Sequence, residues 1–377
     1  MTRHFDAIVV GCGAMGSSAG SNLASRGVST LVLERFGLNH DRGSSHGRTR
    51  IFRQAYYEDE RYVPMLKRAL ESWRELEARS GRALLTMTGG LMIGRPDGEL
   101  VAGARRSAEL HGIGHRMMTA REVNEEYRAF RLDDGLSALY EENAGALSIE
   151  ECLEAFVGLG RRAGGEFRFE EEMTKWKTSQ DGVEVATPKG DYTADRLVLC
   201  GGPWMTKLVG GLPLECERQV QFWFPSEGRD YLRAGGMPVF ISEEEGGAFY
   251  YGIPDVGDGV KVARSHGGRP ADPDHADRTV NKDDVGQVES FIQRRMTKLG
   301  PPVASATCLY TNTPDHNFVV GPHPDSARVT VVSACSGHGF KFASVMGEVV
   351  ADLVTKGKST YDISFLSPGR FAAGGRA

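Results

Sequence analysis

The sequence predicts a mixed α/β fold in which a domain with a parallel sheet is assembled from discontinuous segments and a second domain carries an antiparallel sheet. Apolar runs that end in glycine-rich turns and lead into helices occur at the start, middle and end of the chain, as in parallel β-α-β units. Between them, strand-like runs are joined by Gly-rich turns, which is typical of antiparallel pairs. We expect the first domain to comprise residues 1–85, 146–215 and 319–377, and the second to comprise residues 86–145 and 216–318.

The first β-α-β unit opens the chain. Residues 5–10 form an apolar run that predicts a buried strand, and residues 14–24 are small side chains that predict a helix. Gly27 is expected to end this helix, because glycine is favoured just after a helix C-terminus. Residues 29–33 then predict a second strand parallel to the first.

Further elements follow before the middle of the chain. A polar segment at residues 39–50 precedes a long amphipathic helix, and a short strand is expected at residues 90–93. The apolar face of that helix carries Leu66, Leu70, Trp73 and Leu76. Ser148-Ile149-Glu150-Glu151 resembles a capping box, so another helix should begin there.

The second half of the chain continues the alternation. Leu197-Val198-Leu199-Cys200 predicts a buried parallel strand that ends in Gly201-Gly202, and residues 216–265 predict several antiparallel strands. The remaining expected elements are a helix at 283–299, strands at 304–310 and 329–333, and a final helix from the turn Gly337-His338-Gly339 to about residue 355.

Composition excludes several classes of function. The formal net charge is −5 and no long basic tract is present, so nucleic acid is not an expected partner. No apolar run reaches the roughly 18 residues of a membrane span, and the N-terminus lacks a signal-peptide pattern, so we expect a cytoplasmic protein. The six cysteines form no C-x-x-C pair, which indicates buried free thiols rather than disulfides or a metal site.

A dinucleotide fingerprint lies in the first unit. Gly11-x-Gly13-x-x-Gly16 has the spacing at which glycines allow a tight turn, close approach of a pyrophosphate, and close packing of helix on strand. The pyrophosphate would lie at the helix N-terminus. Glu34 ends the second strand, where a carboxylate accepts hydrogen bonds from ribose hydroxyls. This motif alone does not distinguish FAD from NAD.

Four separated segments choose between these cofactors. They are Gly43-Ser44-Ser45-His46-Gly47-Arg48-Thr49-Arg50-Ile51-Phe52-Arg53, then Tyr250-Tyr251-Gly252 with Lys261, then Cys308-Leu309-Tyr310-Thr311-Asn312-Thr313-Pro314-Asp315, and Ser336-Gly337-His338-Gly339-Phe340-Lys341-Phe342. With the fingerprint, they resemble the monomeric sarcosine oxidase and N-methyltryptophan oxidase family, within the D-amino-acid-oxidase-like flavoenzymes. The resemblance runs from Phe5 to about Ser367, and it implies a Rossmann-like FAD-binding domain plus a substrate domain.

The resemblance also implies how FAD is held. Cys308 stands where the family forms a thioether to the flavin 8α-methyl group, although a buried strand thiol is the usual fate of a free cysteine. The other implied cofactor contacts, beside the three fingerprint glycines and Glu34, come from Ala14, Met15, Arg35, Ser44, Thr49, Met173, Gly337, Gly339 and Lys341.

The same resemblance implies roles in substrate binding and catalysis. Arg53 and Lys341 match two cations that clamp the substrate carboxylate, a role that suits the guanidinium fork and a second point charge. Lys261 matches a lysine that speeds the reaction with oxygen, with Arg50 adding positive charge, although it could be a plain edge-strand lysine. Tyr251 and Tyr310 match aromatic residues of the substrate cavity, although such residues are more often simply core.

The implied activity is that of a monomeric oxidase. It removes two electrons from the C–N bond of a small secondary amino acid, the imine is hydrolysed, and O2 becomes hydrogen peroxide. Three alternatives stay open: glycine-oxidase-like release of glyoxylate from an N-carboxymethyl amine, an NAD-dependent dehydrogenase, and a non-catalytic flavin-binding protein.

Two positions depart from the family pattern. Ser45-His46 stands where the family often has two histidines, and Ser265, followed by His266, stands where it has a histidine four residues after the active-site lysine. Both changes replace an imidazole by a hydroxymethyl group. We therefore expect room for a nitrogen substituent larger than methyl.

Overall fold

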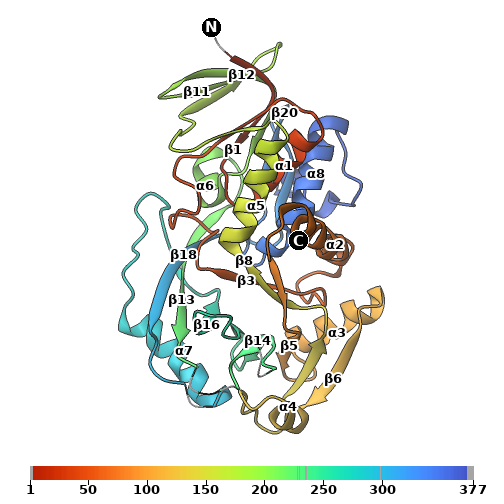
Figure 1. Cartoon of the computed structure of the whole chain (residues 1–377), viewed down its shortest axis with the longest axis vertical. Coiled ribbons are helices and arrows are strands. Elements are labelled where there is room, and N and C mark those ends of the chain that lie inside the picture. Colours follow the sequence, from red (N-terminus) through yellow and green to blue (C-terminus); the bar gives the residue numbers. More distant parts are fainter. Residues whose placement is uncertain (1–2, 227, 229, 234–235, 298, 372–377) are drawn as a thin grey trace.

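The computed structural model describes residues 3–226, 228, 230–233, 236–297 and 299–371. The molecule is elongated, with one large sheet in its upper half and another in its lower half as drawn in Figure 1. A small third sheet lies between them in Figure 1 and is formed by β3 (Thr49–Phe52), β8 (Gly145–Ser148) and β4 (Leu85–Met87).

The upper sheet has eight strands in the order β10-β11-β12-β1-β2-β9, with β20 paired to β12 and β19 to β20. The pairs β1–β12, β1–β2, β2–β9 and β12–β20 are parallel, as expected from the β-α-β pattern. The strands are β1 (Arg3–Val10), β2 (Thr30–Leu33), β9 (Glu166–Arg168), β10 (Lys175–Thr178), β11 (Val183–Thr187), β12 (Gly190–Leu199), β19 (Val319–His323) and β20 (Ser326–Ser333).

Four helices accompany this sheet. α1 (Ala14–Ser25) packs between α5 (Ile149–Arg162) and α8 (Ala343–Lys356), and α2 (Val63–Ser80) packs on α5 and α8. The small residues of α1 permit this close approach, since a Cβ on Gly347 of α8 would lie 2.2 Å from the Ser18 Oγ. On the apolar face of α2, Leu70 is only partly buried, whereas Leu66, Trp73 and Leu76 are buried as expected.

The lower sheet has nine strands in the order β17-β13-β16-β15-β14-β5-β7-β6, with β18 paired to β13. All of its pairs are antiparallel except β5–β14. The strands are β5 (Gly90–Gly94), β6 (His115–Thr119), β7 (Ser137–Glu141), β13 (Glu215–Phe224), β14 (Val239–Glu244), β15 (Ala248–Ile253), β16 (Val260–Ser265), β17 (Arg269–Pro270) and β18 (Ala304–Asn312).

The remaining elements are short or peripheral. They are α3 (Glu99–His111), α4 (Ala120–Glu126), α6 (Met205–Leu208), α7 (Lys282–Arg295), and the 3-10 turns η1 (Glu60–Tyr62), η2 (Gly202–Trp204), η4 (Phe340–Phe342), η5 (Ser364–Leu366) and η6 (Pro368–Phe371). Within the described residues, no helix has the length and apolar character needed to cross a bilayer.

One expected helix ends earlier than predicted, and another begins near Ser148 as expected but without the predicted side-chain cap. The helix expected at 283–299 ends at Arg295, because Met296 is extended and bridges to Phe130. The side chain of Ser148 makes no capping hydrogen bond, and the Ile149 N–H instead donates to the Arg48 carbonyl. Long-range contacts therefore decided both helix ends.

The strands divide between the sheets in line with the expected domains. All upper-sheet strands fall in residues 1–85, 146–215 and 319–377, and the lower-sheet strands fall in the other two segments, except that β13 begins at Glu215. The domain boundaries themselves stay a prediction.

Candidate active site

A cavity of about 620 Å³ lies between the two large sheets. Its size is typical of a ligand site. Among the residues singled out from the sequence, those that line it are Gly11, Gly13, Ala14, Met15, Glu34, Arg35, Ser44, Arg50, Arg53, Met173, Tyr251, Tyr310, Gly337, Gly339 and Lys341. Gly16, Thr49, Lys261 and Cys308 do not line it.

One end of the cavity is the turn between β1 and α1. Gly11 has φ +92°, and a Cβ there would lie 2.4 Å from the Cys200 carbonyl oxygen. A Cβ on Gly16 would lie 1.8 Å from the Gly11 carbonyl oxygen. Both positions therefore require glycine, and the turn leaves the N-terminus of α1 open to the cavity, where an anion is stabilised.

Ser45 contributes to this end, which the sequence analysis did not foresee. Its Oγ accepts a hydrogen bond from the Ala14 N–H at 3.0 Å, at the first turn of α1. A Cβ on Gly13 would lie 3.2 Å from that Oγ. The hydroxymethyl group thus lies at the nucleotide end, and the expectation of extra room for a substrate substituent stays a prediction.

Glu34 is buried where the ribose was expected. Its Oε2 accepts from the Cys12 N–H at 2.7 Å and its Oε1 from the Phe36 N–H at 2.9 Å. Burial raises the pKa of this carboxyl, and the backbone donors oppose that rise. Arg35 also lines the cavity, but its Nη1 already donates to Asp274 at 2.6 Å.

Arg53 and Lys341 meet at the other end of the cavity with a carboxylate that sequence reasoning missed, Glu58. Arg53 is 2% exposed, donates to the Ala55 carbonyl at 2.9 Å and forms an ion pair with Glu58. Lys341 Nζ donates to the His338 carbonyl at 2.7 Å. Within the described part of the chain, Arg53 Nε and Glu58 Oε2 have no hydrogen-bond partner.

The charges of Arg53, Lys341 and Glu58, called the trio below, are strongly coupled. Burial, with Arg53 adding to it and Glu58 opposing it, lowers the pKa of Lys341 to about 7. Burial alone would raise the pKa of Glu58, but Arg53, His338 and Lys341 hold it below its usual value. The cluster therefore carries two buried cations, one buried carboxylate and an unused guanidinium donor.

Lys261, Arg50 and Cys308 form a second cluster, of which only Arg50 reaches the cavity surface. Lys261 Nζ donates to the Gly47 and Thr49 carbonyls at 2.9 and 2.8 Å. Arg50 Nη2 donates to the Ser44 and His46 carbonyls at 2.8 and 2.6 Å. Burial, with Arg50 adding to it, holds the pKa of Lys261 well below its usual value.

Cys308 is joined to this cluster through Gln221. Its Sγ accepts from Gln221 Nε2 at 2.9 Å, and Gln221 Oε1 lies 3.4 Å from Arg50 Nη1. Cys335, in contrast, lines the cavity, with its Sγ accepting from the Thr311 N–H at 3.3 Å.

Tyr251 and Tyr310 line the cavity together with an imidazole that was not expected to matter. Burial raises the pKa of both phenols, so both remain hydrogen-bond donors. His266 lines the cavity beside Ser265, with its ring 5.4 Å from that of Tyr310. The expectation that Ser265 leaves extra room stays a prediction, and His266 supplies an imidazole to the cavity wall one residue later.

His338 has a structural role. Its Nδ1 contacts the Tyr56 hydroxyl at 2.5 Å and its Nε2 the His316 carbonyl at 3.0 Å. Burial lowers its pKa to about 3, so the ring is neutral at physiological pH and donates its Nε2 proton to that carbonyl. This ties the turn before α8 to the loop after β18.

Comparison with known proteins decides the family. Residues 6–353 match the family described as FAD dependent oxidoreductase. The chain belongs to this family. It is 42% identical to the monomeric sarcosine oxidase of Streptomyces avermitilis, with 99% of both chains covered. It is 32% identical to the N-methyl-L-tryptophan oxidase of Yersinia pestis (strain Pestoides F), with 97% of this chain and 99% of the relative covered.

Solved structures agree with the fold. NikD, described as an unusual amino acid oxidase essential for nikkomycin biosynthesis, has a TM-score of 0.86 at 24% identity, with 97% of this chain and 98% of that chain covered. L-proline dehydrogenase from P. horikoshii has a TM-score of 0.82 at 22% identity, with 98% of each chain covered.

These relationships settle the class of enzyme. The protein is an FAD-dependent amine oxidase of the sarcosine oxidase and N-methyltryptophan oxidase type, acting on CH–NH donors. The alternatives of an NAD-dependent dehydrogenase and of a non-catalytic flavin-binding protein were wrong. The residues present fit FAD, since the crowded glycines leave backbone at the cavity wall and the N-terminus of α1 opens to the cavity, where a pyrophosphate would lie.

Proposed function

We propose that this flavoenzyme oxidises a secondary amino acid, such as sarcosine or a bulkier N-substituted glycine, bound by its carboxylate to Arg53 and Lys341. The observation that carries the proposal is the pair of buried cations with an unused donor, Arg53 Nε. An unpaired buried charge costs several kcal/mol, so this end of the cavity favours an anionic ligand.

The charge balance of the trio agrees with a monoanionic group. With Lys341 protonated, Arg53 and Lys341 contribute two positive charges and Glu58 contributes one negative charge. One carboxylate neutralises the remainder. Arg53 can offer Nε and one Nη as a fork, and Lys341 can add a point charge.

Bound FAD supplies the two-electron acceptor for this reaction. The chain's part is to hold the amino acid by its carboxylate, to shield the reacting carbon from water and to place positive charge at the oxygen-reacting side. The amino acid loses two electrons and becomes an imine, which water hydrolyses, and O2 takes up the two electrons with two protons to give H2O2. Lys261, which is buried, and Arg50, which is partly buried, would favour reduction of O2 electrostatically when charged.

The cofactor would be tethered through Cys308. In support, Cys308 lies on β18 and reaches Arg50 through Gln221, so its thiol adjoins the cation cluster assigned to the flavin ring. The test is acid precipitation of purified protein. We expect wild type and C335S to keep the yellow colour in the pellet and C308S to release it; colour released from wild type, or retained by C308S, would contradict the tether.

Substrate choice is tested by peroxide release. Sarcosine, N-ethylglycine and N-carboxymethyl amino acids would be assayed in parallel, with formaldehyde and glyoxylate measured as products. We expect secondary amino acids to give peroxide and an aldehyde. Glyoxylate from an N-carboxymethyl amine as the main product would indicate glycine-oxidase-like cleavage instead, and no turnover of any secondary amino acid would contradict the proposal.

A monomeric cytoplasmic enzyme completes the proposal. It is supported by relatives that are named monomeric sarcosine oxidase. Light scattering on purified protein would give the mass of one chain, and a mass of two chains at micromolar concentration would contradict it.

A further inference from the structure

We infer that His266, oriented by Glu217, takes the ammonium proton of the amino acid substrate. This inference rests on the proposed function and adds a proton acceptor to the same site. Oxidation of the C–N bond needs the neutral amine, whereas amino acids in water carry an ammonium group. The cations assigned above to the carboxylate and to oxygen are donors, and Glu58 is paired with Arg53, so a further acceptor near the nitrogen would favour the neutral amine.

The position of His266 depends on an unusual backbone conformation. It follows β16, which carries Lys261, and it has φ +60°, a left-handed conformation that costs a residue with a Cβ about 1–2 kcal/mol. Such strained residues concentrate at functional sites. The turn carries the imidazole into the cavity wall, against the glycine turn that precedes Lys341.

The Nε2 edge of the ring faces the glycine turn at the cavity wall, and we assign the contact with substrate to this atom. A Cβ on Gly337 would lie 2.8 Å from it, which places this nitrogen at the wall formed by the Gly337-His338-Gly339 turn. The ring packs edge-on between Tyr310, at 5.4 Å, and His316, at 4.8 Å between centroids. It is therefore held in place by packing on both sides.

The nearby Glu217 carboxylate favours a proton on Nδ1 of the His266 ring. Its Oε2 lies 3.8 Å from Nδ1, which is buried and has no hydrogen-bond partner among the described residues. With the Nδ1 proton directed at this carboxylate, Nε2 keeps its lone pair, as in other histidines oriented by a carboxylate. Glu217 is thus a positioning residue, and His266 is the group that contacts substrate.

The carboxylate is itself fixed. Its Oε1 accepts from Gln219 Nε2 at 2.7 Å and from the Gly268 N–H at 2.5 Å, and its Oε2 accepts from Asn312. Burial would raise the pKa of Glu217, but His266, the Gly268 N–H and Asn312 hold it below its usual value. An ionised partner at Nδ1 stabilises the imidazolium that forms when Nε2 takes a proton.

Among the neighbouring charged groups, the Glu217 carboxylate favours a proton on the His266 ring and the Arg264 cation opposes it. Around His266 stand Glu217 from β13, Tyr310 from β18, His316 from the following loop and Arg264 from its own strand. Burial, with His266 adding to it, lowers the pKa of His316, so that ring stays neutral when the His266 ring gains charge.

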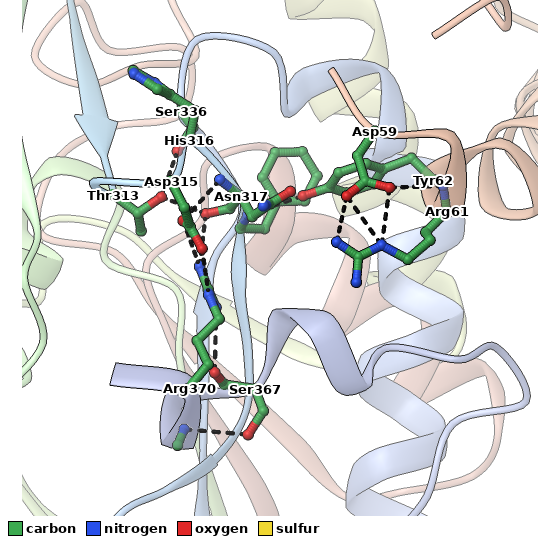
Figure 2. A network of polar contacts seen from close by, with 12 residues as sticks. Asp59, Arg61, Tyr62, Thr313, Asp315, His316, Asn317, Ser336, Ser367 and Arg370 are labelled. Atoms are coloured by element: carbon green, nitrogen blue, oxygen red, sulfur yellow. Dashed lines mark hydrogen bonds and ion pairs between the residues drawn. The ribbon is translucent and has the colours of Figure 1, made fainter. Parts of the chain in front are cut away.

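The loop that carries His316 is braced from the far side. Arg370 donates to both Asp315 oxygens, at 2.8 and 3.1 Å, and to the Asn317 carbonyl at 3.1 Å, as Figure 2 shows.

In the proton transfer from the substrate ammonium to His266, the substrate N–H bond breaks, the Nε2–H bond forms, and water later removes the proton. The amine lone pair is then free while the carboxylate stays on Arg53 and Lys341.

The test compares ligands with and without the amine. Variants H266N and E217Q, with H275Q as an exposed control, would be mixed anaerobically with sarcosine from pH 6 to 9 while flavin absorbance is followed. Acetate binding, read from the flavin spectrum, reports on the carboxylate clamp alone. Asn tolerates the left-handed backbone at position 266 and cannot take the proton.

We expect H266N to slow flavin reduction about 10²-fold at neutral pH and to remove one ionisation from the pH profile. E217Q should show a smaller loss in the same direction, and acetate affinity should change less than about twofold in both. Wild-type pH behaviour in H266N, or an equal loss of acetate affinity, would overturn the inference. Failure of sarcosine and every other secondary amino acid to reduce wild-type flavin would instead overturn the proposed function on which it rests.

Discussion

Lys341 shows how a single residue links stability to activity. Burial lowers its pKa to about 7, against the usual value of 10.5, so the folded state disfavours the ammonium form. Between pH 7 and 10.5 unfolding takes up a proton, and this group therefore makes the folded protein more stable as pH rises through that window. Below pH 7 Lys341 is protonated in both states, and the full cost of burying its charge is subtracted from the stability of the folded protein.

Replacing this lysine should separate the two effects. We expect K341M to have a higher melting temperature than wild type at pH 6.5 and little difference near pH 10, because it removes the strained charge. The same variant should lose about 100-fold or more in kcat/KM for a secondary amino acid, since one partner of the carboxylate is gone. Thermal melts at both pH values, with K189M as an exposed control, would check this; a K341M that is less stable at pH 6.5 than at pH 10 relative to wild type would contradict it.

At the residue scale, the sequence could predict the residues that sit in recognisable motifs. Arg53, Lys341, Tyr251 and Tyr310 do lie at one cavity. Ser45 and His266 could not be predicted, because their importance comes from contacts with residues far away along the chain. Glu58 pairs with Arg53 five residues away but lies outside the recognised motifs. His266 in particular depends on a left-handed turn that has no sequence signal in a non-glycine residue.

At the scale of elements, the β1–α1 turn makes a sharp prediction about glycine. Gly11 and Gly27 both have positive φ, +92° and +79°, but only Gly11 is crowded, since a Cβ at Gly27 meets nothing within 4 Å. We expect G11A to be purified without FAD and G27A to keep it with a modest loss of stability of about 1 kcal/mol. The ratio of flavin absorbance to protein absorbance measures the difference, and a fully flavinylated G11A would contradict the assigned role of the turn.

The C-terminal turn η6 makes another prediction, through the Arg370–Asp315 contact (Figure 2). The loop that it holds contributes Asp315, His316 and Asn317 to the cavity wall. We expect R370Q to raise KM for the amino acid several-fold and to increase hydrogen exchange in residues 313–317, since a charge-assisted pair of this kind is worth about 1.5–3 kcal/mol. R82Q, which breaks an ion pair on the surface, is the matched control; unchanged exchange in the loop would contradict the bracing role.

The sequence predicted the existence of most elements because their apolar periodicity is strong. It predicted their ends less well. Ser148 looked like a helix cap but its neighbour bonds to Arg48, and the helix beginning at Lys282 stops where Met296 joins a bridge to Phe130. The cap that does form, between Asn281 and Asp284, has a side-chain pair outside the usual Ser/Thr and Glu/Gln pattern.

At the scale of the whole molecule, the cavity lies where the carboxyl end of the parallel sheet faces the antiparallel sheet. The turn after β1 lies at the carboxyl end of a parallel strand, where open α/β sheets bind ligands, and β14, β15 and β18 close the space from the other sheet. The alternation of parallel and antiparallel strand patterns along the sequence predicted the two sheets. The cavity between them could not be predicted from periodicity, because it depends on how the sheets pack.

The central claim is that a secondary amino acid, held by Arg53 and Lys341, delivers two electrons to the bound flavin. The most direct measurement is flavin absorbance in the anaerobic wild-type holoenzyme after addition of sarcosine or N-ethylglycine, beside R53M. The account predicts rapid bleaching in wild type, bleaching slowed by about 100-fold or more in R53M, and return of colour on admission of air. Unchanged colour in wild type, or equally fast bleaching in R53M, would contradict it.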